Sequence, residues 1–222
     1  MTRHALPLLS AAVMAAAAFQ PGRATAADTD ARTFAVTVDG KPAGSFKMTL
    51  RVADDGTETI TTVAAVRVKV LLVSYTYELQ SLEVWKGGKL VSVDATANDD
   101  GKRKAVKVVA ADGGLTVTAN GRARKVAADV LTSTGWRHPG AADKARDLVI
   151  LDTEDGTETA ARLTPLPAAK IAVNGSVVET QRFHLTGKKL DTVWWFDPAG
   201  RPVRHEMKWD GHKVVLELTA RR

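Results

Sequence analysis

Eight dipeptides in which Asp or Asn precedes Gly punctuate this chain of 222 residues: Asp39-Gly40, Asp55-Gly56, Asp100-Gly101, Asp112-Gly113, Asn120-Gly121, Asp155-Gly156, Asn174-Gly175 and Asp210-Gly211. Most of them lie between segments rich in Val, Thr and Leu. These residues tolerate the positive φ angles that tight β-hairpin turns require. The chain is therefore predicted to be all-β, a single antiparallel meander that reverses again and again.

The segments between the turns alternate apolar and polar residues, which is typical of strands with one buried face. In 203–209, for example, Val203, His205, Met207 and Trp209 share one face. At residues 70–73 the apolar set moves from even to odd positions, which we interpret as a corner that lets the sheet curl. About a dozen short strands rarely stay flat, so the sheet is expected to curl into an open or incomplete β-barrel.

The first 26 residues have the three regions of a secretory signal peptide. A short basic start is followed by an apolar run over 5–19 and by the small-residue pattern Ala24-Thr25-Ala26. The run is too short to span a bilayer comfortably, and no later stretch is long enough for a transmembrane helix. We therefore expect export to the periplasm or the extracellular space, and a single antiparallel β domain over 27–222.

Charge and cysteine content exclude few classes of function. The formal charge is +6, and removing the segment that holds Arg3 and Arg23 lowers it to +4, too mild an excess to indicate nucleic-acid binding. The chain has no Cys, so its stability must come from packing and ladder hydrogen bonds. Seven basic residues lie on adjacent predicted strands: Lys102, Arg103, Lys104, Lys107, Arg122, Arg124 and Lys125. We interpret them as a solvated outer face, or as an edge that Lys protects against aggregation, rather than as a binding patch for anionic polymers or headgroups.

The longest stretch without strand character covers residues 127–146. It contains Thr132-Ser133-Thr134-Gly135-Trp136 and a short helical turn expected over 141–146. Loops over an open barrel end often carry function, so Trp136 is the candidate for a plug or a lid over that end. A lid predicts an indole that is partly buried and mobile. Trp194 and Trp195 are neighbours in a strand and must face opposite sides, which predicts one in the core and one against solvent, a loop or a ligand.

Several sequence blocks together resemble an uncharacterised family of exported bacterial β-rich proteins: Val68-Lys69-Val70, Tyr75-Thr76-Tyr77-Glu78, Glu83-Val84-Trp85, 97–102, 132–136 and 194–203. The resemblance covers nearly all of the chain after the signal peptide. The closing hairpin also resembles a broader group of exported proteins, similar in architecture to the half-barrel of lipoprotein carriers. The resemblance implies a fold and a location. It implies no activity and transfers no catalytic residue.

No group of residues has the pattern of a catalytic, metal or cofactor site. The Asp-rich turns at 98–101 and 152–156 lack the Glu that a calcium loop places six residues after its Gly. His184, His205 and His212 lack the short spacing of a zinc site. Ser133 lies near His138 without the elbow of a serine hydrolase, so local hydrogen bonding is its expected role.

The aromatic residues favour a non-enzymatic binding protein over an enzyme. A curled sheet has a concave apolar face, which suits a hydrophobic small molecule or a lipid. The candidate ligand-binding residues are Tyr75, Tyr77, Trp136, Trp194 and Trp209. The alternatives are a hydrolase with its site in the barrel mouth and a structural protein of the cell envelope. A purely apolar concave face favours binding, whereas two or more carboxylates or His side chains there favour catalysis.

Overall fold

A computed structural model describes residues 28–70, 73–140, 143–173 and 175–222 of the chain. The predicted signal peptide, residues 1–26, lies outside these ranges. The strands are β1 (Asp28–Val38), β2 (Lys41–Val52), β3 (Thr57–Val70), β4 (Val73–Lys86), β5 (Lys89–Asp99), β6 (Lys102–Ala111), β7 (Gly114–Ala119), β8 (Arg122–Ala127), β9 (Leu131–Thr132), β10 (Arg146–Leu151), β11 (Glu158–Val173), β12 (Ser176–Gly187), β13 (Leu190–Phe196), β14 (Pro202–Trp209) and β15 (His212–Arg221).

All of these strands belong to one sheet, in the order β8-β7-β6-β5-β4-β3-β2-β1-β15-β14-β13-β12-β11-β10-β9. The ladders are antiparallel except for the short parallel pair of β9 and β10. Strands that follow one another in the sequence are therefore neighbours in the sheet, except β8 and β9, which lie at its two ends. The ladder between β1 and β15 joins the two halves of the chain. The predicted all-β antiparallel meander is confirmed.

Five of the eight dipeptides have positive φ at both residues: those that begin at Asp39, Asp100, Asp112, Asn120 and Asp210. Each lies in the two-residue connection between consecutive antiparallel strands. Two positive φ angles define the type I′ turn, whose twist matches that of the strands. In the dipeptides at residues 55 and 155 only the Gly has a positive φ, because these turns are longer. Asn174 lies outside the described residues.

The corner predicted at residues 70–73 is wrong. The strands on either side of it, β3 and β4, pair antiparallel with Val70 opposite Val73, so the chain reverses there. The change of phase from even to odd positions is the change that a hairpin produces when its turn has an even number of residues. The curl of the sheet therefore does not depend on a bend at this point.

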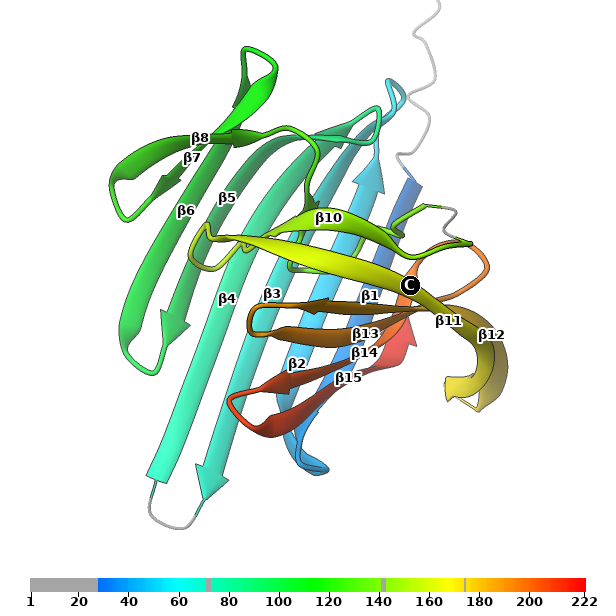
Figure 1. The fold of residues 1–222 in the computed structure, drawn as a ribbon. Helices are drawn as coiled ribbons and strands as arrows, with labels where there is room; N and C mark the ends of the chain where they lie inside the picture. Colours follow the sequence, from blue (N-terminus) through cyan, green and yellow to red (C-terminus); the bar gives the residue numbers. More distant parts are fainter. Residues whose placement is uncertain (1–27, 71–72, 141–142, 174) are drawn as a thin grey trace, which may run out of the picture.

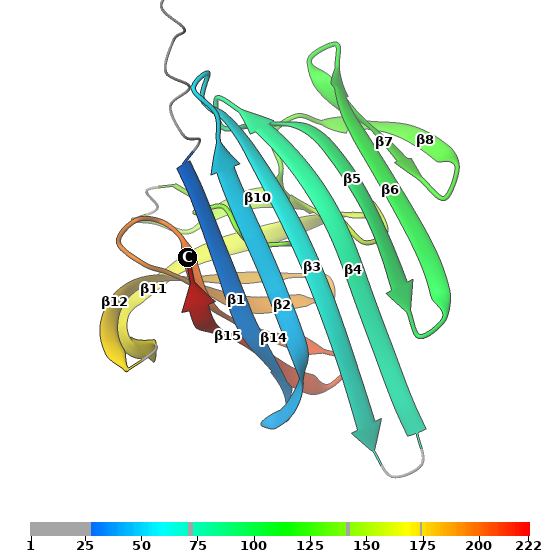
Figure 2. The ribbon, with the colours of Figure 1, turned by 180° about the vertical axis from the view of Figure 1, so that it is seen from behind.

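The sheet curls until its second half covers the concave face of the first. Strands β10–β13 lie in front of the long strands β2–β6 in Figure 1 and behind them in Figure 2. The terminal strands β8 and β9 do not pair with each other, so the barrel is incomplete. Side chains bridge the gap instead: Arg124 on β8 donates to the carbonyl of Gly156 and forms an ion pair with Glu158 on β11.

The segment between β8 and β10 is irregular, as predicted, but the expected helical turn over 141–146 is not found. Ala141 and Ala142 lie outside the described residues, 143–144 form a bend, and Arg146 begins β10. The described part of the chain contains no helix. Accordingly, none of it forms a helix with the length and apolar character needed to cross a bilayer.

Candidate functional site

The loop that follows β9 enters the concave face and is fastened to a buried carboxylate. Glu83, on the inner face of β4, is fully buried. Its Oε2 accepts hydrogen bonds from the indole N–H groups of Trp85 at 3.0 Å and Trp136 at 3.1 Å. The hydroxyls of Thr132 and Thr134 donate to the same carboxylate at 2.9 and 2.6 Å. Four donors from two distant segments therefore hold the loop against β4.

Burial raises the pKa of Glu83, and the four hydrogen bonds oppose that rise. The ring of Trp136 meets that of Trp85 edge-on, with 5.7 Å between the ring centroids. The guanidinium of Arg137 lies over both indoles and forms an ion pair with Glu58 on β3. Because protein groups surround the carboxylate on all these sides, Glu83 fastens the loop and has no exposed surface for a substrate.

Trp136 does not have the exposure predicted for a mobile lid. Its side chain is 2% exposed and hydrogen-bonded, so it is part of the core rather than partly buried. The loop was predicted correctly as the main irregular segment, and the buried Trp136 fits a plug rather than a lid. The lid prediction was wrong because the sequence gives no sign that Glu83 would accept the indole N–H.

The same loop contacts the opposite half of the sheet through Gly135. A Cβ atom at Gly135 would lie 2.7 Å from His205 Cε1 and 2.9 Å from Trp194, and its φ is +63°. His205 on β14 is buried between Phe34 and Trp194. Burial lowers the pKa of His205 to about 4, so the imidazole is neutral near pH 7. The loop therefore fills the space between β4 and β14.

Both members of the Trp194-Trp195 pair are buried, and one of them meets a loop, as the prediction allowed. Trp194 lies under the loop, beside Gly135 and His205. Trp195 faces the other side of β13 and is 7% exposed, with the guanidinium of Arg204 5.7 Å from its ring centroid. Packing from the curled sheet thus covers both faces of this strand.

The other predicted aromatic residues meet at the opposite end of the barrel. Tyr75, near the start of β4, and Trp209, at the end of β14, lie with ring centroids 5.1 Å apart. Four strands separate β4 from β14 in the sheet, so this contact spans the concave face. Trp209 is 45% exposed, whereas Tyr77 is half-buried and packs against the main core. We call Tyr75, Tyr77 and Trp209 the aromatic mouth.

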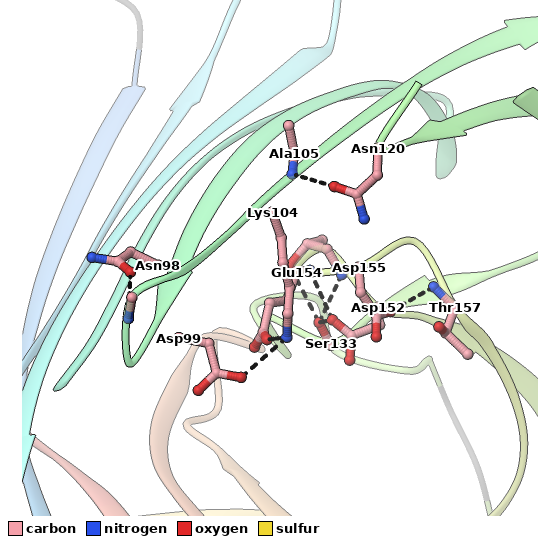
Figure 3. A network of polar contacts seen from close by, with 12 residues as sticks. Asn98, Asp99, Lys104, Ala105, Asn120, Ser133, Asp152, Glu154, Asp155 and Thr157 are labelled. Carbon is pink, nitrogen blue, oxygen red and sulfur yellow. Dashed lines mark hydrogen bonds and ion pairs between the residues drawn. The ribbon is translucent and has the colours of Figure 1, made fainter. Parts of the chain in front are cut away.

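A network of charged groups lies beside Tyr75 of the aromatic mouth, and Figure 3 shows its members Asp99, Lys104 and Glu154. Tyr75 donates to Asp99 at 2.8 Å, and the ammonium of Lys104 pairs with Asp99 and Glu154. Glu154 comes from the β10–β11 turn, where Asp152 Oδ1 accepts from its backbone N–H at 2.7 Å. The network therefore ties the ends of β5 and β6 to the turn that closes the barrel.

Burial and nearby carboxylates determine the protonation of these groups. Burial raises the pKa of Tyr75 and Tyr77, and the charges of Asp99 and Glu154 raise it further. The pKa of Asp99 is lowered, first by the Tyr75 hydrogen bond and then by Lys104. Burial raises the pKa of Asp152, and Asp155 and Glu154 add to the rise. The phenols are therefore neutral donors, poorly suited to act as nucleophiles.

The three histidines considered for a metal site are separate. His184 bonds to Asp191, His212 bonds to Asp39, and His205 is buried under the loop. Within the described ranges no group of three His, Asp or Glu residues is placed to hold a metal ion. Asp155 Oδ1 accepts from the Thr157 N–H and Asn98 Oδ1 from the Gly101 N–H, so these turn residues stabilise their own turns.

Ser133 has local partners. Its Oγ accepts from the Thr153 N–H at 3.1 Å and lies 3.4 Å from Asp152 Oδ1. His138, the base considered for a hydrolase, instead contacts Gln181 at 2.7 Å. A nucleophile needs a base within hydrogen-bond reach, and Ser133 lacks that arrangement with His138.

The structure thus divides the five predicted ligand-binding residues into two groups. Trp136 belongs to the loop and bonds to Glu83, and Trp194 packs against the same loop at Gly135, whereas Tyr75, Tyr77 and Trp209 form the aromatic mouth. Sequence reasoning missed Glu83 and Lys104. Glu83 was detectable as a charged residue in phase with Leu79 and Trp85 on β4, and Lys104 as one in phase with Val106 and Val108 on β6. The concave face is therefore not purely apolar, but its carboxylates are already paired with donors or Lys104.

The fold and these contacts define an all-β protein with an incomplete barrel and an inserted loop. The family model for DUF6134, a domain of unknown function, matches residues 34–219, and the chain belongs to this family. No curated protein matches the chain. Among solved structures it is similar to a β-barrel-like protein with the domain of unknown function DUF1849 from Brucella abortus, at 10% identity and a TM-score of 0.65. That similarity covers 87% of this chain and 96% of the Brucella protein, and it concerns the fold.

Proposed function

We propose that the protein is an exported, non-enzymatic binding protein that holds a hydrophobic or lipid-like ligand at the aromatic mouth. The observation that carries the proposal is the contact between Tyr75 and Trp209 across the concave face. A large aromatic side chain that is 45% exposed on the inner side of a curled sheet leaves apolar surface for a ligand to cover. Barrel mouths are common sites for such ligands.

The residues behind the pair support this assignment. Val66 on β3, Met207 on β14 and Val214 on β15 are half-buried and pack against the main core, as Tyr77 does. They occupy the same inward phase as Tyr75 and Trp209. A ligand that displaced the Trp209 ring would therefore meet apolar side chains from β3, β4, β14 and β15.

The charged border of the mouth supports binding more than catalysis. Lys104 forms ion pairs with both Asp99 and Glu154, and the two tyrosines keep their protons. These groups offer hydrogen bonds to the polar end of an amphipathic ligand. The hydrolase alternative has one favourable observation, the raised pKa of Asp152 beside Glu154. If Asp152 acted as a general acid, an Asp152→Asn variant would still bind the ligand but would lose turnover.

The test is the affinity of the purified protein for a neutral apolar fluorescent probe such as Nile red. We expect saturable binding and a Trp209→Ala variant that binds about tenfold more weakly, because the loss of one aromatic contact is worth about 1–1.5 kcal/mol. Val109→Ala is the matched control, since Val109 is 51% exposed on the convex face of β6. Equal affinities for the protein and both variants would contradict the proposal.

A further inference from the structure

A hollow lies at the opposite end of the strands from the aromatic mouth. It has a volume of about 440 Å³ and is formed by the start of β1, the 199–201 turn and the end of β15. Its charged lining residues are Asp28, Asp30, Arg32, Arg201, Arg221 and Arg222. With Asp197, which pairs with Arg32, the side chains bring four guanidinium groups against three carboxylates.

Arg32 is the fixed part of the hollow. It is 5% exposed, and it donates to Asp30, to Asp197 at 2.9 Å and to the carbonyl of Pro202 at 3.0 Å. Asp197 in turn accepts from the backbone N–H groups of Ala199 and Arg201. These contacts fix the position of the 199–201 turn, and with it the backbone of Arg201, beside β1.

Arg221 is a second cation beside Arg32, and it lacks the carboxylate partners that Arg32 has. It is directly opposite Arg32 in the β1–β15 ladder, so the two cations share one face of the sheet. Like charges in such a pair destabilise a sheet. Arg32 has its carboxylates, whereas Arg221 and Arg222 have no side-chain partner among the residues that the structure describes. Arg201 has a long ion pair with Asp30, at 3.7 Å.

We propose that this hollow binds a phosphate-type oxyanion, held by Arg221 and Arg201 with help from Arg222. Guanidinium groups match the oxygens of phosphate in pairs of hydrogen bonds, and an anion would give Arg221 the kind of partner that Arg32 has in Asp30 and Asp197. The site is independent of the aromatic mouth. The phosphate belongs either to a small soluble molecule or to a phospholipid headgroup.

The test measures binding of pyrophosphate by calorimetry at low ionic strength, and binding to vesicles of phosphatidylcholine with and without phosphatidic acid. We expect one pyrophosphate per protein and affinity at least tenfold weaker in an Arg221→Ala/Arg222→Ala variant. If the headgroup is the ligand, pyrophosphate binds weakly and the same variant loses its preference for vesicles with phosphatidic acid. Both outcomes support the site.

The matched control removes the same charge elsewhere. Arg122 and Lys125 lie on the edge strand β8 and are exposed, so an Arg122→Ala/Lys125→Ala variant should keep its affinity for the oxyanion. An Arg221→Lys/Arg222→Lys variant keeps the charge and should bind with intermediate affinity, because Lys cannot form the paired contact. Equal losses in the Arg and β8 variants, or no saturable binding to either probe, would overturn the proposal.

Discussion

Glu83 is the residue on which the inserted loop depends. Replacing it with Ala would remove the acceptor of two indole N–H groups and two hydroxyls. The hydroxyls of Thr132 and Thr134 are 3.0 Å apart and can bond to each other, whereas the indoles would be left unpaired. Each buried unpaired donor costs about 1–3 kcal/mol, so Glu83→Ala should lower the free energy of unfolding by about 2–6 kcal/mol.

The control for this prediction is Glu83→Gln, which keeps the volume and one acceptor oxygen. Urea unfolding should place it between the wild type and Glu83→Ala. The Gln variant also has no group that titrates at position 83, so its stability should not show the pH dependence that Glu83 contributes. The pKa of Glu83 is raised in the folded protein. Its contribution to the free energy of unfolding is therefore present at low pH and is lost as the pH rises above the ordinary pKa of a Glu side chain. Two variants as stable as the wild type would mean that the carboxylate does not fasten the loop.

His205 predicts an opposite dependence on pH. Its pKa is lowered from 6.5 to about 4, so as pH falls below 6.5 the unfolded chain gains a proton that the folded protein does not. Stability should therefore fall by up to about 3 kcal/mol between pH 6.5 and pH 4 and level off below that. Because Glu83 and Asp152 titrate in the other sense, the His205 contribution is the difference between the wild type and His205→Gln in urea melts at several pH values. Parallel pH profiles would show that His205 titrates normally in the folded protein.

Among the elements, the inserted loop has one position where a side chain does not fit. Gly135 combines a positive φ with contacts of less than 3 Å from a Cβ atom to His205 and Trp194. Gly135→Ala should therefore lower stability by about 2–4 kcal/mol, from left-handed backbone strain and from overpacking. Gly140 has a φ of +86° in the same loop and open space around it, so Gly140→Ala carries the strain alone. Thermal unfolding that shifts equally in both variants would indicate that the contact with β14 is loose.

The strands and hairpins were predictable because their determinants are local. Asp-Gly and Asn-Gly fix the turn type, and alternation fixes which side chains face inward. The reversal between Val70 and Val73 was missed because its residues carry none of the usual turn signals. The path of the inserted loop was missed for a different reason. It depends on Glu83 and Gly135 meeting partners far along the chain, and no local pattern encodes those contacts.

For the whole molecule, the curl of the sheet followed from the number of strands, but the way the barrel closes did not. Closure uses the approach of Gly156 to Val117 and the contacts of Arg124 rather than a backbone ladder. The sequence also indicated which aromatic residues face inward without showing that they form two groups at different depths. Only Trp209, at the end of a strand, keeps substantial exposure, so the candidate site is smaller than the predicted set of five.

The most direct measurement for the proposed function is native mass spectrometry of the protein purified from its own host under conditions that preserve bound molecules. The account predicts a species heavier than the mature chain by the mass of one apolar or amphipathic molecule, which organic extraction releases and which is depleted in Trp209→Ala. A protein that carries no such molecule, and that takes up none when the host's lipid extract is added, would contradict it.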